Sequence, residues 1–404
     1  MAPSTETIAI AGGAGAASPP LLELSIVIPC LNEAETLGRC IAKANAAVLA
    51  DGIPAEIIVA DNGSTDGSLE IAERLGAQVI RIPEKGYGNA LMGGIAAARG
   101  RFVLMADGDD SYDLGEAPRF VAALRQGYDL VQGCRVPSGG GTVQPGAMPF
   151  LHRVWGNPMF SALARWWFGV RIHDIQCGMR AFRADVVPRL DLRCTGMEFS
   201  SEMIIKAALR GVRITEIPIT LWPDGRKGRK PHLRTFRDGW RNLRFYLLFS
   251  PQWLFLGPGL VLGALGIVGY LISLPRMRFG QVEFDVHTML FASLALILSF
   301  QAVVFMIMTK VFAITHELLP WSPRIDRVFR VFTLERGLAA GGLLAALGCL
   351  LLLNAFLQWR AVDFGPLDYA KTMRWVIPGV TVTTIGVQAV LSSFFVSILG
   401  LARR

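Results

Sequence analysis

The stretch RFVLMADGDDSY, residues Arg101–Tyr112, decides how the rest of this chain can be interpreted. Its apolar run Phe102–Ala106 is followed by three carboxylates within four residues, Asp107, Asp109 and Asp110. A short apolar run that ends in turn-forming residues predicts a strand buried on both faces, as in a parallel sheet. Because ligands of open α/β sheets bind beyond the carboxyl ends of such strands, Asp107 and Asp109 are predicted to project into a crevice.

These carboxylates have two interpretations. Asp107 and Asp109 are hard oxygen ligands at a spacing that suits Mg²⁺ or Mn²⁺ shared with a substrate diphosphate. An ordinary polar turn is the alternative, because Asp and Gly are common turn residues. A calcium-binding loop fits poorly, since Tyr112 stands where the EF-hand pattern needs Gly.

The composition indicates a membrane protein. The chain has 404 residues, enough for two domains or more. Hydrophobic residues make up 52% of it and the mean hydropathy is +0.42, which is too apolar for an ordinary soluble protein. The net charge of +8 fits contact with anionic headgroups or a polyanionic substrate, and the apolar content argues against nucleic acid as the partner. The six cysteines form no CxxC pair, so we expect free thiols in a reducing compartment.

Strand and helix signals alternate between residues 24 and 133, which predicts a mostly parallel sheet with right-handed crossovers. The predicted strands are Leu24–Pro29, Glu56–Asp61, Gln78–Ile82, Phe102–Asp107 and Asp129–Gly133. The predicted helices are Glu33–Leu49, a helix capped by Asp66 that ends at Leu75, and Tyr87–Ala98.

Polar residues follow three of these strands. They are PCLNE (Pro29–Glu33), DNGSTD (Asp61–Asp66) and DGD (Asp107–Asp109). Each alone could be a helix cap or a turn, but together they converge on one crevice that could accept ribose hydroxyls and base N–H groups or hold a metal. The chain has neither a Walker A pattern nor GxGxxG, which excludes a P-loop and a dinucleotide site.

These motifs, with EKGYGNA (Glu84–Ala90) between them, resemble family 2 glycosyltransferases of the GT-A fold. The resemblance continues through HDIQCGMRAF (His173–Phe182) and Phe199–Pro218. These two segments resemble the polyprenyl-phosphate branch of the family, which includes the dolichyl-phosphate mannose and glucose synthases and their bacterial relatives. The resemblance covers roughly residues 24–250, and the motifs are specific as a set. The QxxRW pattern of processive polysaccharide synthases is absent.

The resemblance implies a site for a nucleotide sugar, a metal and a lipid phosphate. Asp61 is expected to contact the nucleoside, and Asp107 and Asp109 to carry Mg²⁺ or Mn²⁺. The full set expected to bind the UDP- or GDP-hexose is Pro29, Leu31, Asn32, Glu33, Asp61, Gly86 and Asp107. Arg135 and Arg180 are expected near the acceptor phosphate, together with the basic run that contains Arg226 and Lys230. Asp174 either orients the acceptor or Arg180, or forms a plain salt bridge.

Two positions depart from the family pattern. Ser111 stands where the family often has Gln as a further metal contact, and Tyr87 stands where the glycine loop usually carries Lys.

Residues beyond 230 predict a membrane domain. Arg234, Arg237, Arg241 and Arg244 share one face of the segment His232–Phe249, and apolar residues share a neighbouring face, as in a helix lying in the membrane plane. Four apolar stretches follow, each long enough to span a bilayer: Trp253–Leu274, Thr288–Thr309, Gly337–Trp359 and Trp375–Ala402. An aromatic helix, Phe150–Val170, either belongs to the core or lies near lipid headgroups.

The distribution of Lys and Arg predicts the orientation, because cytoplasmic loops carry the excess of positive charge. The loop between the second and third stretches holds Lys310, Arg324, Arg327, Arg330 and Arg336. We therefore expect an integral protein of a bacterial inner membrane with the catalytic domain and both termini in the cytoplasm.

The predicted architecture is a disordered tail (1–20), an α/β GT-A domain (21–231), an amphipathic helix (232–250) and a domain of four transmembrane helices (251–404). The predicted function is inverting, metal-dependent transfer of glucose or mannose from a nucleotide sugar to polyprenyl phosphate. Transfer to a neutral lipid such as diacylglycerol, and a catalytically silent scaffold or flippase component, are the alternatives. Assembly into a homo-oligomer stays open.

Overall fold

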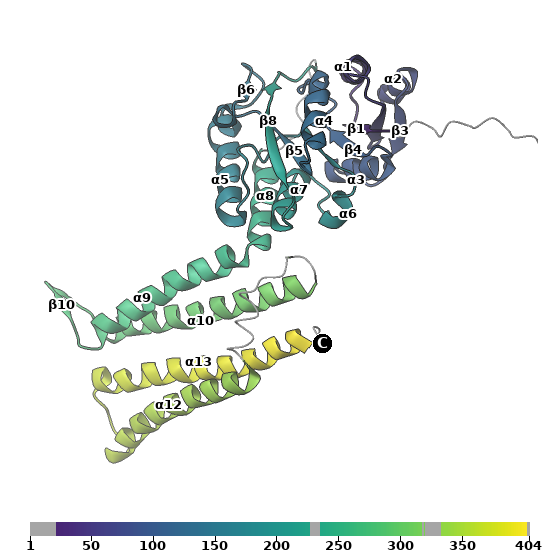
Figure 1. Ribbon diagram of the computed structural model, residues 1–404. Helices are drawn as coiled ribbons and strands as arrows, with labels where there is room; N and C mark the ends of the chain where they lie inside the picture. Colours follow the sequence, from purple (N-terminus) through teal and green to yellow (C-terminus); the bar gives the residue numbers. More distant parts are fainter. Residues whose placement is uncertain (1–21, 227–234, 317–318, 320–332, 402–404) are drawn as a thin grey trace, which may run out of the picture. The chain divides into compact units, whose positions relative to one another are not determined.

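The computed structural model describes residues 22–226, 235–316, 319 and 333–401, which fall into two compact units divided between Asn242 and Leu243 (Figure 1). The predicted tail at 1–20 and the predicted acceptor residue Lys230 lie outside the described residues. The division falls within helix α8 (Thr235–Phe249), so the first half of the predicted amphipathic helix belongs to the N-terminal unit.

The N-terminal unit is built on a seven-stranded sheet in the order β3-β2-β1-β4-β7-β5-β8. The strands are β1 (Leu24–Cys30), β2 (Ala55–Asp61), β3 (Gln78–Arg81), β4 (Phe102–Met105), β5 (Leu130–Cys134), β7 (Arg180–Arg183) and β8 (Ile214–Pro218). Every pairing among them is parallel except those of β7, which lies antiparallel between β4 and β5. The mostly parallel α/β fold is therefore as predicted, and the sequence pattern missed two strands of this sheet, the antiparallel β7 and the parallel β8.

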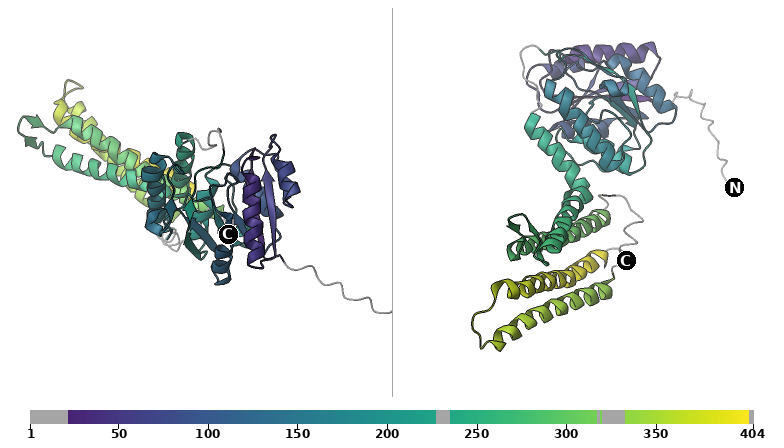
Figure 2. Two further views of the ribbon diagram at one scale, coloured as in Figure 1. Left: turned by 90° about the horizontal axis from the view of Figure 1, so that it is seen from above. Right: turned by 90° about the vertical axis from the view of Figure 1, so that its left-hand side faces the viewer.

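Helices cover both faces of this sheet (Figure 2). Helices α1 (Leu37–Ala50), α2 (Ser68–Arg74) and α4 (Ala117–Arg125) pack on one face, and α3 (Tyr87–Ala97), α5 (Asn157–Phe168) and α7 (Phe199–Leu209) lie on the other. Leu24, Ile26 and Ile28 of β1 face α1, whereas Val27 faces α3, where Gly94 allows close packing. Burial on both faces explains why the strands appear in the sequence as continuous apolar runs.

The chain after β8 returns to the turn that follows β4. The short strands β6 (Thr142–Val143) and β9 (Thr220–Leu221) pair with each other, and Tyr112 forms an isolated bridge with Leu221. Trp222 N donates to Ser111 O at 3.0 Å. The segment after β9 is thereby held along the turn that carries Asp107 and Asp109.

The smaller elements are η1 (Leu114–Glu116), η2 (Pro137–Gly139), η3 (His152–Gly156) and α6 (Val187–Leu190). The predicted aromatic helix is observed as η3, which is π-helical, followed by α5. Its Trp155 is 69% exposed and its Trp166 is 65% exposed, so these two side chains are not core residues. Placement of this surface near lipid headgroups stays a prediction.

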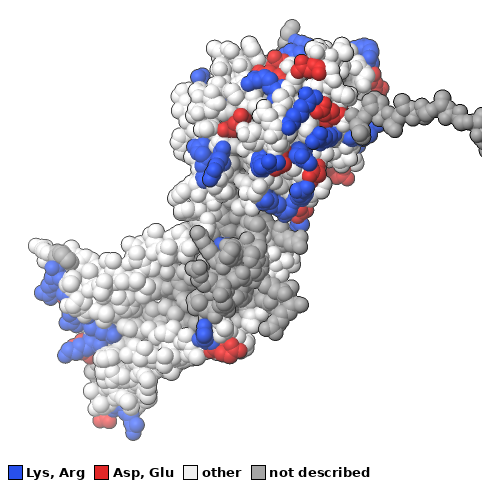
Figure 3. Space-filling view, viewed as in Figure 1, with Lys and Arg blue, Asp and Glu red and all other residues white. Residues whose placement is uncertain are grey.

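In its described residues the C-terminal unit contains four helices long and apolar enough to cross a membrane: Gln252–Ser273, Val286–Thr315, Leu334–Ala361 and Tyr369–Leu399. They comprise η4 (Gln252–Leu256) with α9 (Gly257–Ser273), then α10 (Val286–Thr315), α12 (Leu334–Ala361) and α13 (Tyr369–Leu401), and a hairpin of β10 (Arg278–Phe279) and β11 (Val282–Glu283) joins the first two. Lys, Arg, Asp and Glu gather over the N-terminal unit and are sparse along these helices (Figure 3). The four predicted spans therefore correspond to helices of membrane-spanning length and composition.

Small residues bring these helices close together in pairs. A Cβ on Gly259 of α9 would lie 3.0 Å from Ala302 of α10, and a Cβ on Gly341 of α12 would lie 2.8 Å from the carbonyl oxygen of Gly386 in α13. Gly259 and Gly263, like Gly337 and Gly341, are four residues apart on one helix face, a spacing at which glycine lets two helix backbones approach.

Candidate active site

A cavity of about 400 Å³ opens in the N-terminal unit where β1, β2 and β4 end side by side. The loops after these strands line it, together with the start of α3, the residues before α7, the segment after β9 and the first turns of α8. The lining residues are Pro29, Cys30, Leu31, Glu33, Asn62, Lys85, Gly86, Tyr87, Ala90, Asp107, Gly108, Asp109, Gly196, Met197, Asp224, Arg226, Arg237, Asp238 and Arg241.

Asp107 lies at the start of the polar turn after β4 and lines the cavity. The phenol of Tyr87 donates to Asp107 Oδ1 at 2.8 Å. Burial raises the pKa of Asp107 to about 6, and the charge of Asp109 adds to this rise, while the Tyr87 hydrogen bond opposes it. A half-buried carboxylate beside a second one carries negative charge that a bound cation would stabilise.

Ser111, one of the two positions that depart from the family pattern, orients Asp109. Asp109 Oδ1 accepts hydrogen bonds from Ser111 N at 3.0 Å and from Ser111 Oγ at 2.6 Å. Ser111 is buried and does not line the cavity, so it fixes Asp109 from behind. The neighbouring Asp110 has a φ of 62° and pairs with Arg39 and Lys43 on α1, away from the other two carboxylates.

The donor set at this turn fits a divalent cation that shares its ligands with a substrate. Among the described residues there is no group of three or more His, Cys, Asp or Glu side chains that could hold a metal ion. Asp107 and Asp109 offer carboxylate oxygens, which Mg²⁺ and Mn²⁺ prefer. Mg²⁺ is commonly bound by one or two carboxylates, with water and substrate phosphates as the other ligands, so two protein ligands are sufficient.

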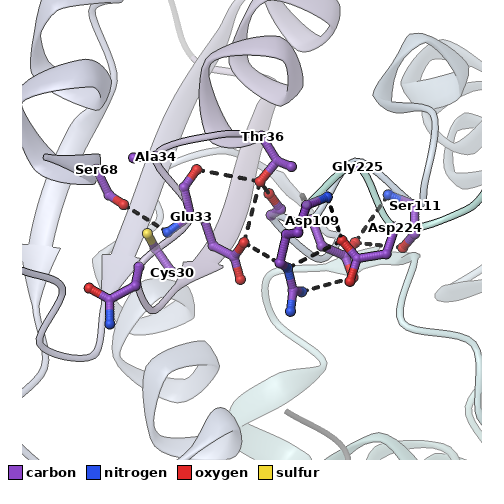
Figure 4. Close-up of polar contacts among 12 residues, drawn as sticks. Cys30, Glu33, Ala34, Thr36, Ser68, Asp109, Ser111, Asp224 and Gly225 are labelled. Carbon is purple, nitrogen blue, oxygen red and sulfur yellow. Dashed lines mark hydrogen bonds and ion pairs between the residues drawn. The ribbon is translucent and has the colours of Figure 1, made fainter. Parts of the chain in front are cut away.

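Glu33 and Arg226 join the loop after β1 to the segment after β9. Arg226 Nε lies 3.0 Å from Glu33 Oε2, and Arg226 Nη2 lies 3.1 Å from Asp109 Oδ2. Asp224 Oδ1 lies 3.3 Å from Arg226 Nε, and Figure 4 labels the three carboxylate residues Glu33, Asp109 and Asp224. Burial raises the pKa of Glu33 to about 7, and the charge of Arg226 limits the rise.

Asn62 holds the glycine-containing loop at the start of α3. Its Nδ2 donates to the carbonyl oxygens of Ile82 and Glu84 at 3.1 and 2.8 Å, and its Oδ1 accepts from Gly86 N at 2.7 Å. Lys85 Nζ donates back to the Asn62 carbonyl oxygen at 2.6 Å. Sequence reasoning missed Asn62, although it directly follows the strand-end residue Asp61.

Five of the seven residues predicted to bind the nucleotide sugar line the cavity: Pro29, Leu31, Glu33, Gly86 and Asp107. The other two are used within the loops. Both carboxylate oxygens of Asp61, which is 3% exposed, accept backbone N–H groups of the turn that follows β2. Asn32 Oδ1 accepts from Thr65 N at 2.7 Å, which ties the loops after β1 and β2 together.

The loop before α7 packs against the N-terminus of α3. Gly88 N donates to Thr195 O at 2.9 Å, and a Cβ on Gly88 would lie only 2.2 Å from Cys194 O, so this position requires glycine. Cys194 N donates to the carboxylate of Glu202 at 2.8 Å, and Glu202 is paired with Lys206 at 2.7 Å inside the protein. This buried pair positions the wall of the cavity formed by the next residues.

Arg135 and Asp174 form a buried ion pair. Arg135 Nε and Nη2 donate to the two oxygens of Asp174 at 2.7 and 2.9 Å, and Arg135 N donates to Asp174 Oδ2 at 3.0 Å. Arg135 Nη1 also donates to the hydroxyl of Tyr112 at 3.2 Å. Of the two interpretations of Asp174, this geometry favours the salt bridge.

Arg180 is fully buried on β7 and does not line the cavity. Its Nη1 donates to Ser200 O at 2.6 Å and its Nη2 donates to Cys177 O at 2.5 Å. Direct contact of Arg180 with an acceptor phosphate does not agree with this placement, because strand β7 directs the side chain into the interior. The sequence could not reveal this, since β7 itself was not predicted.

Among the residues that the structure describes, four cations line the cavity: Lys85, Arg226, Arg237 and Arg241. We call these four residues the basic lining. Arg237 and Arg241 were predicted to lie along lipid headgroups, yet both contribute to the cavity wall. Arg241 also lies 3.8 Å from Glu198, and Arg237 lies 3.6 Å from Asp238.

Comparisons with protein families identify both units. Residues 25–190 match the family model described as glycosyl transferase family 2, and residues 307–400 match the glycosyltransferase family 2 C-terminal transmembrane region. The chain is similar to the low-salt glycan biosynthesis hexosyltransferase Agl6 of Haloferax volcanii, with 34% identity over 388 residues that cover 93% of this chain and 89% of the relative.

Two further similarities cover part of the chain. A dolichyl-phosphate hexose transferase of Haloferax volcanii is 35% identical over 198 residues, which are 49% of this chain and 82% of the relative. A crystal structure of glucosyl-3-phosphoglycerate synthase from Mycobacterium tuberculosis with Mn²⁺, uridine diphosphate and glucosyl-3-phosphoglycerate matches 56% of this chain and 78% of that chain, with 24% identity and a TM-score of 0.44.

Proposed function

The chain belongs to glycosyltransferase family 2 and is a membrane glycosyltransferase related to dolichyl-phosphate hexose transferases, and we propose that it transfers a hexose from a nucleotide sugar to a polyprenyl phosphate. The donor is a UDP- or GDP-hexose of the glucose or mannose type. The reaction depends on Mg²⁺ or Mn²⁺ and inverts the configuration at the anomeric carbon.

One observation carries the proposal: a single cavity contains both the carboxylate pair Asp107 and Asp109 and the basic lining. The carboxylates suit a cation that accompanies a nucleoside diphosphate. Several cations beside them suit a second anionic substrate, because charge-assisted hydrogen bonds to phosphate are strong. A neutral acceptor such as diacylglycerol would have no use for this number of positive charges.

The acceptor phosphate would be the nucleophile. A phosphate monoester has a second pKa near 6 and is largely dianionic at pH 7, so it attacks the anomeric carbon without a general base. The basic lining orients this dianion and reduces its repulsion from the donor. A divalent cation bound by Asp107 and Asp109 would neutralise charge on the departing diphosphate.

Of the predicted acceptor residues, Arg226 lines the cavity, and we add Arg237 and Arg241, which were predicted to lie along lipid headgroups. All three line the cavity and would contact the phosphate. Arg135 and Arg180, with guanidinium groups bound by Asp174 and by backbone carbonyls, would instead support the neighbouring strands. The cytoplasmic location of the N-terminal unit and both termini is part of the proposal, and it rests on the Lys and Arg distribution.

The decisive experiment uses the purified full chain in detergent. It is incubated with a panel of UDP- and GDP-hexoses and with undecaprenyl phosphate, undecaprenol or diacylglycerol, and lipid products are identified by mass. The proposal expects a hexosyl phosphate lipid from undecaprenyl phosphate alone. Transfer to undecaprenol or diacylglycerol at a comparable rate would contradict it.

A variant pair tests the basic lining. Arg241→Gln should raise the KM for undecaprenyl phosphate roughly tenfold or more, because a charge-assisted contact contributes about 1.5–3 kcal/mol. Arg244→Gln is the matched control, since Arg244 is exposed on the same helix and does not line the cavity. Equal effects of the two changes would mean that Arg241 has no specific role.

A further inference from the structure

Three carboxylates from different parts of the N-terminal unit surround the guanidinium of Arg226. Arg226 Nε lies 3.0 Å from Glu33 Oε2 and 3.3 Å from Asp224 Oδ1, and Nη2 donates to Asp109 Oδ2 at 3.1 Å. The Arg226 side chain is only 9% exposed. In this structure Arg226 therefore neutralises Asp109.

The contact with Arg226 uses the oxygen of Asp109 that remains for a ligand. Asp109 Oδ1 already accepts two hydrogen bonds from Ser111, as Figure 4 shows, and Oδ2 faces Arg226. A divalent cation that binds Asp109 would meet the positive charge of Arg226 at that oxygen. Because like charges repel strongly where water is excluded, the two cations compete for Asp109.

The backbone of Arg226 stays close to this turn whatever the side chain does. Gly225 N donates to Asp109 O at 2.9 Å, and Arg226 N donates to Asp224 Oδ1 at 2.9 Å. The side chain can therefore leave Asp109 by rotating about its own bonds and still reach the cavity. Arginine is suited to this exchange, since its planar fork matches both carboxylates and phosphates.

The hydrogen bonding of Arg226 is incomplete in its present position. Its Nε and Nη1 are buried and have no hydrogen-bond partner within the part of the chain that the structure describes, although Nε is close to carboxylate charge. A buried N–H without a partner has a cost, so a ligand with more acceptor oxygens would be preferred. A phosphate is such a ligand.

Resting on the proposed function, we propose that Arg226 occupies Asp109 until a divalent cation and the donor diphosphate bind, and that its released guanidinium then binds the acceptor phosphate. Arg226 thus makes acceptor binding dependent on donor loading. The coupling is reciprocal, as thermodynamic linkage requires: whatever factor Mn²⁺ and nucleotide add to lipid affinity, the lipid adds to theirs.

The first test measures Mn²⁺ binding to the full chain without any substrate, from the loss of the electron paramagnetic resonance signal of free Mn²⁺. Arg226→Gln should bind Mn²⁺ about tenfold more tightly than the unchanged protein, since a neighbouring charge commonly alters ionic binding by a factor of this order. Lys43→Gln is the matched control, because Lys43 pairs with Asp110 of the same turn at 2.8 Å. Lys43→Gln should leave Mn²⁺ affinity nearly unchanged.

The second test measures binding of undecaprenyl phosphate in detergent, with and without Mn²⁺ plus UDP or GDP. The unchanged protein should bind the lipid several-fold more tightly when Mn²⁺ and nucleotide are present, and Arg226→Gln should lose this gain. If UDP or GDP with Mn²⁺ weakens lipid binding instead, the freed guanidinium binds the nucleotide and the proposed coupling is wrong.

The two tests separate this inference from the proposed function. If undecaprenyl phosphate does not bind at all, the proposed acceptor is wrong, whereas the Mn²⁺ measurement still decides the competition at Asp109. Mn²⁺ affinity in Arg226→Gln equal to that of the unchanged protein overturns the competition. Should Arg226→Gln fail to fold, Arg226→Met decides in its place: it also removes the charge beside Asp109, so tighter Mn²⁺ binding supports the competition and equal binding overturns it.

Discussion

The buried pair of Asp174 and Arg135 allows the sharpest quantitative prediction. Asp174 is fully buried, and its two oxygens accept three hydrogen bonds from Arg135. In the variant Asp174→Ala the guanidinium would remain buried without its counter-charge. Breaking a buried ion pair from one side typically lowers the free energy of unfolding by about 3–5 kcal/mol.

This loss corresponds to a measurable change in the melting temperature of the N-terminal unit. In a unit of 150–250 residues, 1 kcal/mol shifts the melting temperature by about 2–4 °C. Asp174→Ala should therefore lower the melting temperature by about 6–20 °C. The assay is thermal unfolding of the detergent-solubilised full chain, followed by intrinsic fluorescence and compared with initial activity at low temperature.

Two controls define what the shift means. Arg213→Ala removes an exposed pair with Asp129, in which Arg213 is 66% exposed, and should change stability by no more than about 1 kcal/mol. The double change Asp174→Leu with Arg135→Met should recover part of the loss, because it leaves no unpaired charge. If Asp174→Ala melts within about 2 °C of the unchanged protein but has lost its activity, the pair is not structural and Asp174 acts on the acceptor.

Three further predictions concern the cavity and the membrane domain. Asp109→Asn should lower turnover by more than about 10–100-fold, the loss seen even for groups that only support a metal ligand, and EDTA should abolish activity; full activity in EDTA would refute the metal role. Tyr87→Phe removes a hydrogen bond that favours the Asp107 carboxylate, so the pKa of Asp107 should rise further above its ordinary value. Direct titration with Mn²⁺ should then show a larger loss of affinity at pH 6 than at pH 8, and equal losses at both pH values would contradict the role of Tyr87. In a chain without its native cysteines, a cysteine at Ser322, which lies outside the described residues, should be shielded from impermeant thiol reagents in intact cells, whereas one at Gly280 should react; the reverse pattern would overturn the orientation.

The sequence alone determined those strands and helices that are recognisable from the pattern of apolar residues in one continuous segment. Apolar runs of strand length separated by helical segments predicted β1 to β5, because a strand buried on both faces needs continuous apolar residues. The four membrane spans followed from length and hydropathy alone. Asp107, Asp109 and Glu33 were found because a parallel sheet must bring the ends of its neighbouring strands to one edge.

What the tertiary structure decided is where each charged side chain points and what it contacts. Arg180 and Arg226 are equally plausible phosphate ligands in the sequence, yet the first is enclosed by backbone carbonyls and the second lies between carboxylates. Likewise Arg237 and Arg241 have the spacing of a lipid-facing stripe, and only the packing of α8 places them on the cavity. The physical reason is that these contacts join residues far apart in the chain, such as Asp109 and Arg226, and no local periodicity encodes them.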